Sequence, residues 1–345
     1  MSILEKALSH SKKIGIDECE IVTVEKKTTT VRITDSEIVE IKQNFDKKYG
    51  IRIIHQKKIV SIQTTDSQNI EKDIDSIFET ISNFKPREFW KGLPYKISAR
   101  KIEGTFDDRL EEISGKNSMD IAQSMINSAD SEKIDTITGS LNIVSEDFQL
   151  RNSQGLEFND KATYVSGIIN AESEQGNIPV SGIGHASGRT LSNFSKEQIG
   201  EDAKIMCIES INPQKIESDT YPIIFEPYSV GELLAFVVAS NFNFKTFTEK
   251  KSCFSNKLKE EIGTKEINLI DDPYAPEGIG TKSIDDEGVE TQKKYLVEKG
   301  VLKNTFSNLF DSYKEGQQST GNASRPGSPM GRSSEPIPVS SPHNL

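Results

Sequence analysis

Runs of alternating apolar and polar residues restrict the fold of this chain more than any other feature. The runs occur at residues 19–25, 29–34, 37–45, 49–56 and 58–65, and strand-like residues resume at 136. Side chains of a β-strand point alternately to opposite faces, so this pattern is typical of antiparallel strands with one covered face. Apolar residues recur at helical spacing in residues 2–14 and 70–84, on either side of the first runs. The chain is therefore predicted to be α+β, with antiparallel sheets covered by helices.

Breaks in these patterns divide the 345 residues into five segments. We expect an N-terminal α+β domain at 1–85, a linker at 86–104, a central α+β domain at 105–218, a mainly β C-terminal domain at 219–323 and a flexible tail at 324–345. The linker holds Pro86 and Pro94, which interrupt regular structure. The tail is rich in Pro, Ser and Gly, and it buries too little apolar surface to offset its ordering entropy.

Shorter segments of the central and C-terminal domains carry specific expectations. Asn152–Gly155 lies between two alternating runs and is predicted to be a hairpin turn. Residues 182–188 are rich in glycine and are expected to form a loop that contains His185. In the C-terminal domain, residues 221–225 are predicted to form a short buried strand, and residues 229–240 a strongly apolar helix.

The overall charge of the chain disfavours direct binding to nucleic acid. It carries 42 Lys and Arg against 53 Asp and Glu, a net charge of −11, and no long basic run. Its three cysteines are isolated, which argues for a reducing compartment and against a disulfide framework. The N-terminus lacks the apolar core of a signal peptide, and no apolar run approaches the roughly 20 residues that span a bilayer. We therefore expect a cytoplasmic protein that does not contact membranes.

The stretch from residue 284 to 325 carries the candidate binding residues. These are the acidic cluster Asp285, Asp286 and Glu287, the adjoining Gly288, and the hydroxyl-rich loop Ser319, Thr320, Gly321 and Asn322. We expect them to line a groove or an interface. The acidic cluster either caps a structural element or pairs with a partner's cation, whereas a hard-cation site is a weaker interpretation because consecutive residues converge poorly on one ion. The loop on its own is also typical of a surface turn with exposed backbone amides. Between the two motifs, residues 298–300 are predicted to join two short strands.

The same stretch resembles the C-terminal domain of the TldD/PmbA family. The resemblance is carried by Asp-Asp-Glu-Gly-Val at 285–289, Gly-Val-Leu-Lys at 300–303, Ser-Thr-Gly-Asn-Ala at 319–323 and, in the central domain, Asn-Ser-Gln-Gly at 152–155. It implies a relationship to proteins named as modulators of DNA gyrase, whose TldD branch comprises zinc metalloproteases. Family members continue past the Ser-Thr-Gly-Asn-Ala run, so the resemblance implies a C-terminal domain that is incomplete in a chain stopping at Leu345.

The metal-binding motif of the TldD branch has no counterpart in this sequence. That branch uses a His-Glu-x-x-x-His helix, in which two histidines hold zinc and the glutamate acts as a general base. By resemblance the helix corresponds to the segment after residues 223–225, which contains no histidine and, in its apolar run, the single carboxylate Glu232. The four histidines of the chain are His10, His55, His185 and His343, which lie in separate segments. We predict no metal ligands, no catalytic residues and no cofactor.

Without the metal helix, the chain resembles the PmbA/TldE branch of the family. The resemblance implies a non-catalytic subunit that pairs with a metal-bearing TldD-like subunit, or with itself as a dimer. Such a metallopeptidase complex degrades or processes peptides, and this chain shapes its groove. The alternative is a stand-alone binding protein that modulates a larger target such as DNA gyrase. An independent hydrolase with unrecognised residues is a third interpretation.

Overall fold

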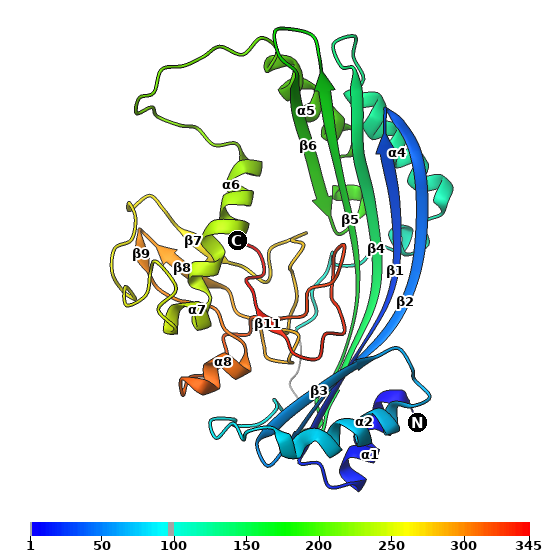
Figure 1. Cartoon of the computed structure of the whole chain (residues 1–345), viewed down its shortest axis with the longest axis vertical. Coiled ribbons are helices and arrows are strands. Elements are labelled where there is room, and N and C mark those ends of the chain that lie inside the picture. The colour runs from blue at the N-terminus through cyan, green and yellow to red at the C-terminus, as the bar shows by residue number, and fades with distance from the viewer. Residues whose placement is uncertain (1, 96–99) are drawn as a thin grey trace.

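A computed structural model describes residues 2–95 and 100–345 of the chain. Its central element is a curved, six-stranded antiparallel sheet with the strand order β3-β2-β1-β4-β5-β6 (Figure 1). The strands are β1 (Glu18–Thr34), β2 (Glu37–His55), β3 (Lys58–Thr64), β4 (Thr136–Asn152), β5 (Glu157–Ser173) and β6 (Val180–Gly188). Helices cover one end and one face of the sheet, and the C-terminal region occupies its concave side (Figure 1). The fold is α+β, as predicted.

The strands expected in two separate domains belong to this one sheet. β1 pairs with β2 on one side and with β4 on the other, so the segment at 86–104 connects two parts of a single layer. β1 and β2 are also continuous through residues 26–28 and 46–48, where breaks in the pattern suggested separate strands. These residues are polar, but the ladder between β1 and β2 continues through them. The ammonium of Lys26 is satisfied by two backbone carbonyls of the C-terminal segment, at 2.7 and 2.6 Å.

Two helices at the end of the sheet confirm the predicted helices at 2–14 and 70–84. They are α1 (Ile3–Lys13) and α2 (Ile70–Thr80), and α2 is extended by a 3-10 turn at Ile81–Asn83. α1 begins with a capping box, in which Ser2 Oγ accepts from the Glu5 amide at 3.2 Å and the Glu5 carboxylate accepts from the Ser2 amide at 2.7 Å. Their apolar faces pack on the first three strands through residues that include Leu4, Ala7, Ile21, Ile51, Ile70 and Ile74.

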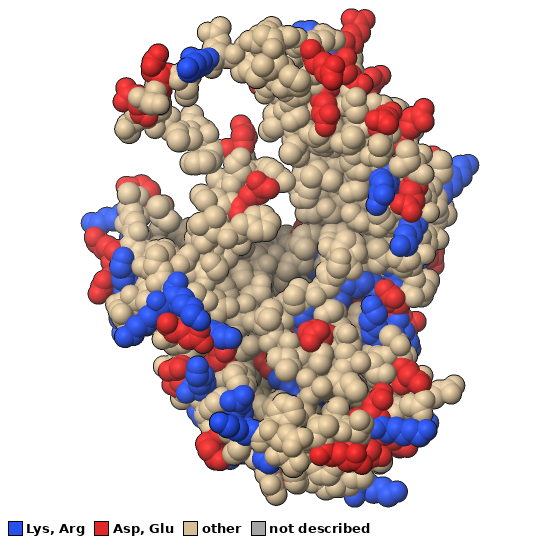
Figure 2. Space-filling model, in the orientation of Figure 1, with Lys and Arg blue, Asp and Glu red and all other residues tan. Residues whose placement is uncertain are grey.

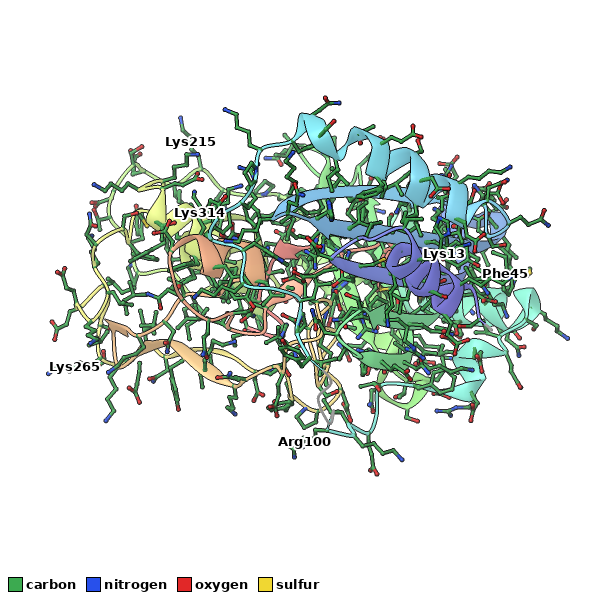
Figure 3. The ribbon with its side chains drawn as sticks, turned by 90° about the horizontal axis from the view of Figure 1, so that it is seen from below. Lys13, Phe45, Arg100, Lys215, Lys265 and Lys314 are labelled. Carbon is green, nitrogen blue, oxygen red and sulfur yellow. The ribbon has the colours of Figure 1, made fainter. Side chains whose placement is uncertain are left out.

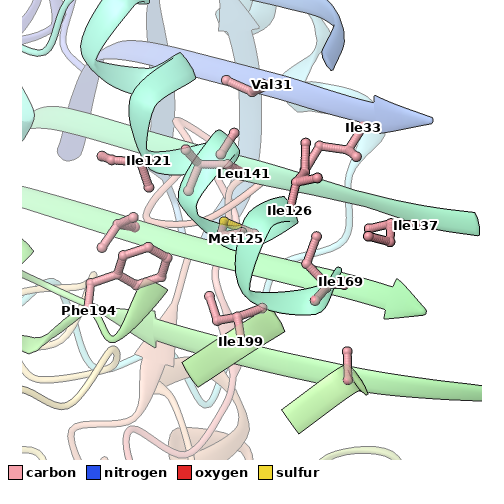
Figure 4. Close-up of a cluster of buried hydrophobic side chains, with 14 of the residues drawn as sticks. Val31, Ile33, Ile121, Met125, Ile126, Ile137, Leu141, Ile169, Phe194 and Ile199 are labelled. Carbon is pink, nitrogen blue, oxygen red and sulfur yellow. The ribbon is translucent and has the colours of Figure 1, made fainter. Parts of the chain in front are cut away.

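A second pair of helices, α4 (Gly115–Ala129) and α5 (Lys196–Glu209), covers one face of the sheet. A short helix, α3 (Asp108–Glu111), precedes α4. The buried core between the sheet and these helices contains Val31, Leu141 and Ile169 from strands, Met125 and Ile126 from α4, and Ile199 from α5 (Figure 4). α4 begins where Ser114 Oγ accepts a hydrogen bond from the Asn117 amide at 3.1 Å.

The glycine-rich residues 182–188 form strand β6 and not the loop that was expected. The reason is close packing, because a Cβ at Gly184 would collide with the backbone carbonyl of Ile199 on α5. Glycine here allows a helix to approach the sheet, which is one of the roles of glycine within a strand. Since side chains alternate along a strand, the exposed His185 faces the concave side of the sheet.

The C-terminal region consists of short elements. Its helices are α6 (Pro227–Leu233), a π-helical turn at Leu234–Val238, a 3-10 turn at Ala239–Phe242, α7 (Phe244–Thr248) and α8 (Leu309–Lys314). Its strands are β7 (Leu269–Asp271), β8 (Lys294–Glu298), β9 (Val301–Leu302), β10 (Ala323–Ser324) and β11 (Val339–Ser340). β7, β8 and β9 form one small sheet, and β10 pairs with β11. The predicted turn at 298–300 and the helical character of 229–240 are therefore confirmed.

Residues 221–225 are not the buried strand that was expected. They adopt no strand conformation, and Ile224 is 97% exposed. A continuous apolar strand is buried only where neighbouring elements cover both of its faces. Within residues 2–95 and 100–345, no strand pairs with this segment.

Residues 324–345 pack against the concave face and are not a flexible tail. Arg325, Arg332 and Ser334 are only 1%, 4% and 1% exposed. The segment supplies β11 (Figure 1), which pairs with β10. Its composition predicts disorder because apolar side chains are few. Its order comes instead from buried cations and backbone hydrogen bonds whose partners lie in distant parts of the chain.

Candidate functional site

The acidic turn lies in the interior of the protein. Asp285, Asp286 and Glu287 are at most 1% exposed. The carboxylate of Asp285 accepts hydrogen bonds from the backbone amides of Glu287 at 3.0 Å, Val289 at 2.9 Å and Ala323 at 2.9 Å. The last bond joins the turn to the Ser-Thr-Gly-Asn loop, so the two predicted motifs do come together. They meet as a buried structural unit, and their place in a groove or an interface stays a prediction.

The two neighbouring aspartates have opposite electrostatic environments. Burial and then the charge of Glu287 raise the pKa of Asp285 to about 7, although its backbone donors oppose the shift. Burial acts in the same direction on Asp286, but Lys282 and Arg332 outweigh it and hold the pKa of Asp286 below its ordinary value. Lys282 Nζ and Arg332 Nε each lie 3.0 Å from Asp286 Oδ1. Asp286 is therefore a paired anion and not a free general base.

Glu287 begins a chain of buried ion pairs that reaches the first strands. Its Oε1 lies 2.8 Å from Arg52 Nη1, and its Oε2 accepts the Leu309 amide at 2.8 Å. Arg52 Nη2 lies 2.9 Å from one oxygen of Glu20, and Arg325 Nη2 lies 2.5 Å from the other. Two cations and two carboxylates alternate in this chain. The alternation offsets the large cost of removing each charge from water.

A second branch joins Arg332 to the middle of the sheet. Arg332 Nη1 lies 3.2 Å from Glu146 Oε1, and its Nη2 lies 2.7 Å from Asp160 Oδ2. The guanidinium also stacks 4.7 Å from the centroid of Phe148. We call the whole set the ion-pair network, which consists of Glu20, Arg52, Glu146, Asp160, Lys282, Asp286, Glu287, Arg325 and Arg332.

The Ser-Thr-Gly-Asn loop is held in place by its own side chains. Thr320 Oγ1 donates to Asn322 Oδ1 at 2.8 Å, and Asn322 Nδ2 donates to Asp271 Oδ2 at 2.7 Å. Gly321 has a φ of +70°, a conformation that favours glycine. Ser319 and Thr320 remain half-buried, whereas Asn322 is fully buried. The loop is therefore a packed turn, and only its first two residues reach the surface.

Three cavities border the ion-pair network, and two of them reach the acidic turn. A small one of about 150 Å³ is lined by residues that include Tyr164, Lys282, Asp286, Arg332 and His343. A larger one of about 700 Å³ is lined by Arg52 and Glu287 together with apolar residues such as Phe84, Phe310 and Ile337. The larger volume is in the range of small-molecule sites. Among the predicted site residues, Asp286 lines the smaller cavity and Glu287 the larger one, while Ser319 and Thr320 line a separate cavity of about 560 Å³.

The residues present do not fit the zinc ion that the resemblance to metalloproteases implies. α6 follows residues 223–225 as expected, but it carries only Glu232 as a metal-ligating side chain. Within residues 2–95 and 100–345, no three His, Cys, Asp or Glu side chains are grouped so as to hold a metal ion. His185 faces α6, with its ring 5.7 Å from that of Tyr228 and its Nε2 3.4 Å from Ser166 Oγ. A catalytic zinc requires about three protein ligands, which this arrangement does not supply.

The sequence analysis missed the cations of the network. The composition around Arg325 and Arg332 predicts a flexible tail, and the pattern around Arg52 predicts only a strand. The sequence does contain one indication of a buried charge. Glu20 lies two positions before Val22 and therefore points to the same face of β1. Glu20 and Arg52 are also direct cross-strand partners. A charged residue in phase with apolar ones indicates a covered face on which that charge needs a partner.

On the face in Figure 2, Lys and Arg are interspersed with Asp and Glu and do not gather into one basic patch. No helix in the described ranges combines the length and the apolar character needed to cross a bilayer.

Comparison with known proteins gives consistent matches along the chain. Residues 19–83 match the PmbA/TldA metallopeptidase domain 1, and residues 218–345 match the PmbA/TldA metallopeptidase C-terminal domain. An uncharacterized protein of Methanocaldococcus jannaschii is 26% identical over 325 residues, which are 93% of this chain and 74% of that protein. Metalloprotease PmbA of Escherichia coli O157:H7 is 22% identical over 332 residues, 93% of this chain and 73% of that protein. The crystal structure of TldE from Thermococcus kodakarensis shares the fold, with a TM-score of 0.88 and 21% identity over 99% of this chain and 76% of that one.

Proposed function

The chain belongs to the PmbA/TldD family, and on this premise we propose that it is a TldE-like, non-catalytic subunit of a peptide-processing complex in the cytosol. It pairs with a metal-bearing TldD-like subunit, and peptides are cleaved at the metal of that partner. The composition of α6 supports the non-catalytic role, because Glu232 is the one metal-ligating side chain on this helix. The match in fold to a TldE structure is consistent with the same branch.

The apolar surface of residues 221–237 carries this proposal. Nine large apolar side chains of this segment are exposed, namely Tyr221, Ile223, Ile224, Phe225, Tyr228, Val230, Leu233, Phe236 and Val237. Contiguous exposed apolar surface of this kind marks an interaction site in a soluble protein. α6 stands over the concave side of the sheet (Figure 1). A partner seated on this segment therefore also encloses the space in which a peptide can be held.

Co-expression with the TldD-like protein of the same source tests the proposal. We expect the two chains to purify together, and we expect the complex to hydrolyse an unfolded peptide. This chain alone should neither hydrolyse the peptide nor bind stoichiometric zinc. Ile224→Asp and Phe236→Asp should each weaken co-purification, because a charge is placed in the apolar contact. Ile205→Asp is the matched control, since Ile205 is 44% exposed on α5.

Two outcomes would overturn the proposal. Peptide turnover by the pure chain would identify an independent hydrolase. Recovery of an unrelated target such as a topoisomerase, with no affinity for the TldD-like protein, would favour the stand-alone binding protein.

A further inference from the structure

One long strand of the sheet presents an uncovered edge. β3 pairs with β2 only over residues 49–55. Residues 39–48 have β1 on one side and, within the described part of the chain, no strand on the other. All of them are exposed, including the large apolar residues Val39 at 57%, Ile41 at 36% and Phe45 at 75%. Figure 3 places Phe45 at the outer margin of the molecule. Unpaired backbone groups along such an edge form a template for another strand.

The apolar face of this edge continues the core beneath α4. Ile41 lies directly opposite Val31 in the ladder between β2 and β1. Val31 is fully buried in the core that α4 covers. Directly opposite residues share a face of the sheet, so Ile41 extends the buried apolar layer to the edge. The strand carries charges and a β-bulge beside Arg32, which are features that protect an edge, yet this apolar layer remains uncovered.

We propose that the edge of β2 pairs with the same edge of a second copy of this chain, antiparallel and centred on Ile41. The pairing joins two six-stranded sheets and covers the apolar layer at both edges. It is an interface between copies, so it goes beyond the subunit role proposed above and requires no metal-bearing partner.

The charges beside Ile41 and the position of β3 select the register of this pairing, in which Ile41 lies opposite its own copy. Residues directly opposite each other in an antiparallel pair must point to the same face of the sheet. When the two strands are identical and related by a twofold axis, this is possible only if one residue lies opposite its own copy, and the pair is then centred on that residue. A centre at Lys42 or at Glu40 would place that residue against its own copy, and like charges directly opposite are destabilising. If the pair were centred beyond Lys42, the turn at residues 35–36 of one copy would collide with β3 of the other copy. β3 already pairs with β2 from Tyr49 onward, so that part of the edge is occupied. A centre at Ile41 opposes Ile41 to itself and each Glu40 to Lys42 of the other copy.

Cysteine cross-linking tests the register directly. Opposite residues of an antiparallel pair have Cα atoms about 4.5–5.5 Å apart, which a disulfide can bridge. We expect Ile41→Cys to give a cross-linked dimer under mild oxidation. The background is Cys253→Ser, because the other two cysteines are buried. Phe45→Cys is the matched control, since residue 45 is more exposed but lies eight positions, about 27 Å, from its copy in this register.

A charge swap tests the pairing without cysteines. Glu40→Lys and Lys42→Glu each place like charges across the interface, and each should raise the dimer dissociation constant about tenfold. The double variant E40K/K42E restores opposite charges and should recover wild-type association. Sedimentation velocity over a concentration series measures the constants, and circular dichroism confirms that each variant is folded.

Three results would overturn the interface. They are a wild-type monomer at every concentration, equal cross-linking of the two cysteine variants, and a double variant no better than either single one. None of these bears on co-purification with a TldD-like protein, so the two proposals fail separately.

Discussion

Glu20 and Arg325 lie 305 positions apart in the sequence, yet Oε1 of Glu20 and Nη2 of Arg325 are 2.5 Å apart in the interior. Their side chains are 2% and 0% exposed. The pair joins β1 to the segment whose composition is typical of disorder. Arg325 also donates from its backbone amide to Asp286 at 2.7 Å, so one residue fixes the acidic turn and the sheet to each other.

Replacing Arg325 with methionine should destabilise the protein strongly. The substitution keeps most of the side-chain volume but leaves Glu20 with one cation where it had two. Removing one partner of a buried ion pair costs about 3–5 kcal/mol, and we expect a loss near the lower value because Arg52 remains. Urea unfolding measures the change. Arg109→Met is the control, since the side chain of Arg109 is 60% exposed and its ion pair should contribute far less. Equal losses in the two variants would contradict the structural role of the network.

The free energy of unfolding should depend on pH through His343. Burial and then the charge of Lys282 lower the pKa of His343 to about 4. In the unfolded chain the pKa is about 6.5, so between these values only the unfolded state binds the proton. The contribution of His343 to the free energy of unfolding therefore falls as the pH is lowered from about 6.5 to about 4, by at most about 1.4 kcal/mol per pH unit.

His343→Gln should remove this contribution, so that the variant loses less stability than the wild type when the pH is lowered. Urea unfolding at pH 4.5 and pH 7 compares the variant with the wild type. An unchanged difference between the two pH values would show that His343 does not contribute.

Limited proteolysis should cut the chain before its C-terminal segment is touched. Residues 212–226 are exposed throughout, and Lys215 projects from the surface (Figure 3). Arg325 and Arg332 are almost fully buried. We expect trypsin to cleave after Lys215 first, as read by mass spectrometry of the earliest fragments. Early cleavage at either arginine would support the flexible tail that the composition predicts.

Alanine at Gly184 should destabilise the contact between β6 and α5. Its Cβ would collide with the backbone carbonyl of Ile199, which cannot move as a side chain does. Overpacking of this kind costs about 1–3 kcal/mol. Gly231→Ala is the control, because nothing lies within 4 Å of a Cβ there and alanine favours the helix by up to about 1 kcal/mol. Thermal unfolding of the two variants should shift in opposite directions.

Elements stabilised by nearby residues could be predicted from the sequence. The turn at Asn152–Gly155 is an example, because the side chain of Asn152 accepts from the amides of Gln154 at 2.9 Å and Leu156 at 3.1 Å. The continuity of β1 through Lys26 could not be predicted. The carbonyl groups that satisfy Lys26 belong to Met330 and Arg332, so the local sequence suggested a break.

In the candidate site, too, the features set by nearby residues could be predicted and those set by distant residues could not. Motif and resemblance placed Asp286 and Glu287 among the site residues, and one of the two interpretations gave them a structural role. Their burial could not be foreseen, because the cation beside Glu287 is Arg52, 235 positions away. A single sequence shows the charge on each residue but not which distant charge meets it.

The ion-pair network also sets an order of events during protein synthesis. β1, β2 and β4 leave the ribosome long before Arg325 and Arg332 are translated, and until then Glu20 and Glu146 lack these partners. Burying a carboxylate without its cation is costly, so the nascent sheet keeps its concave face hydrated. Closing that face requires contacts across about 300 residues, which is a slow, non-local step. The closed structure therefore cannot be completed on the growing chain before Arg325 and Arg332 have been translated.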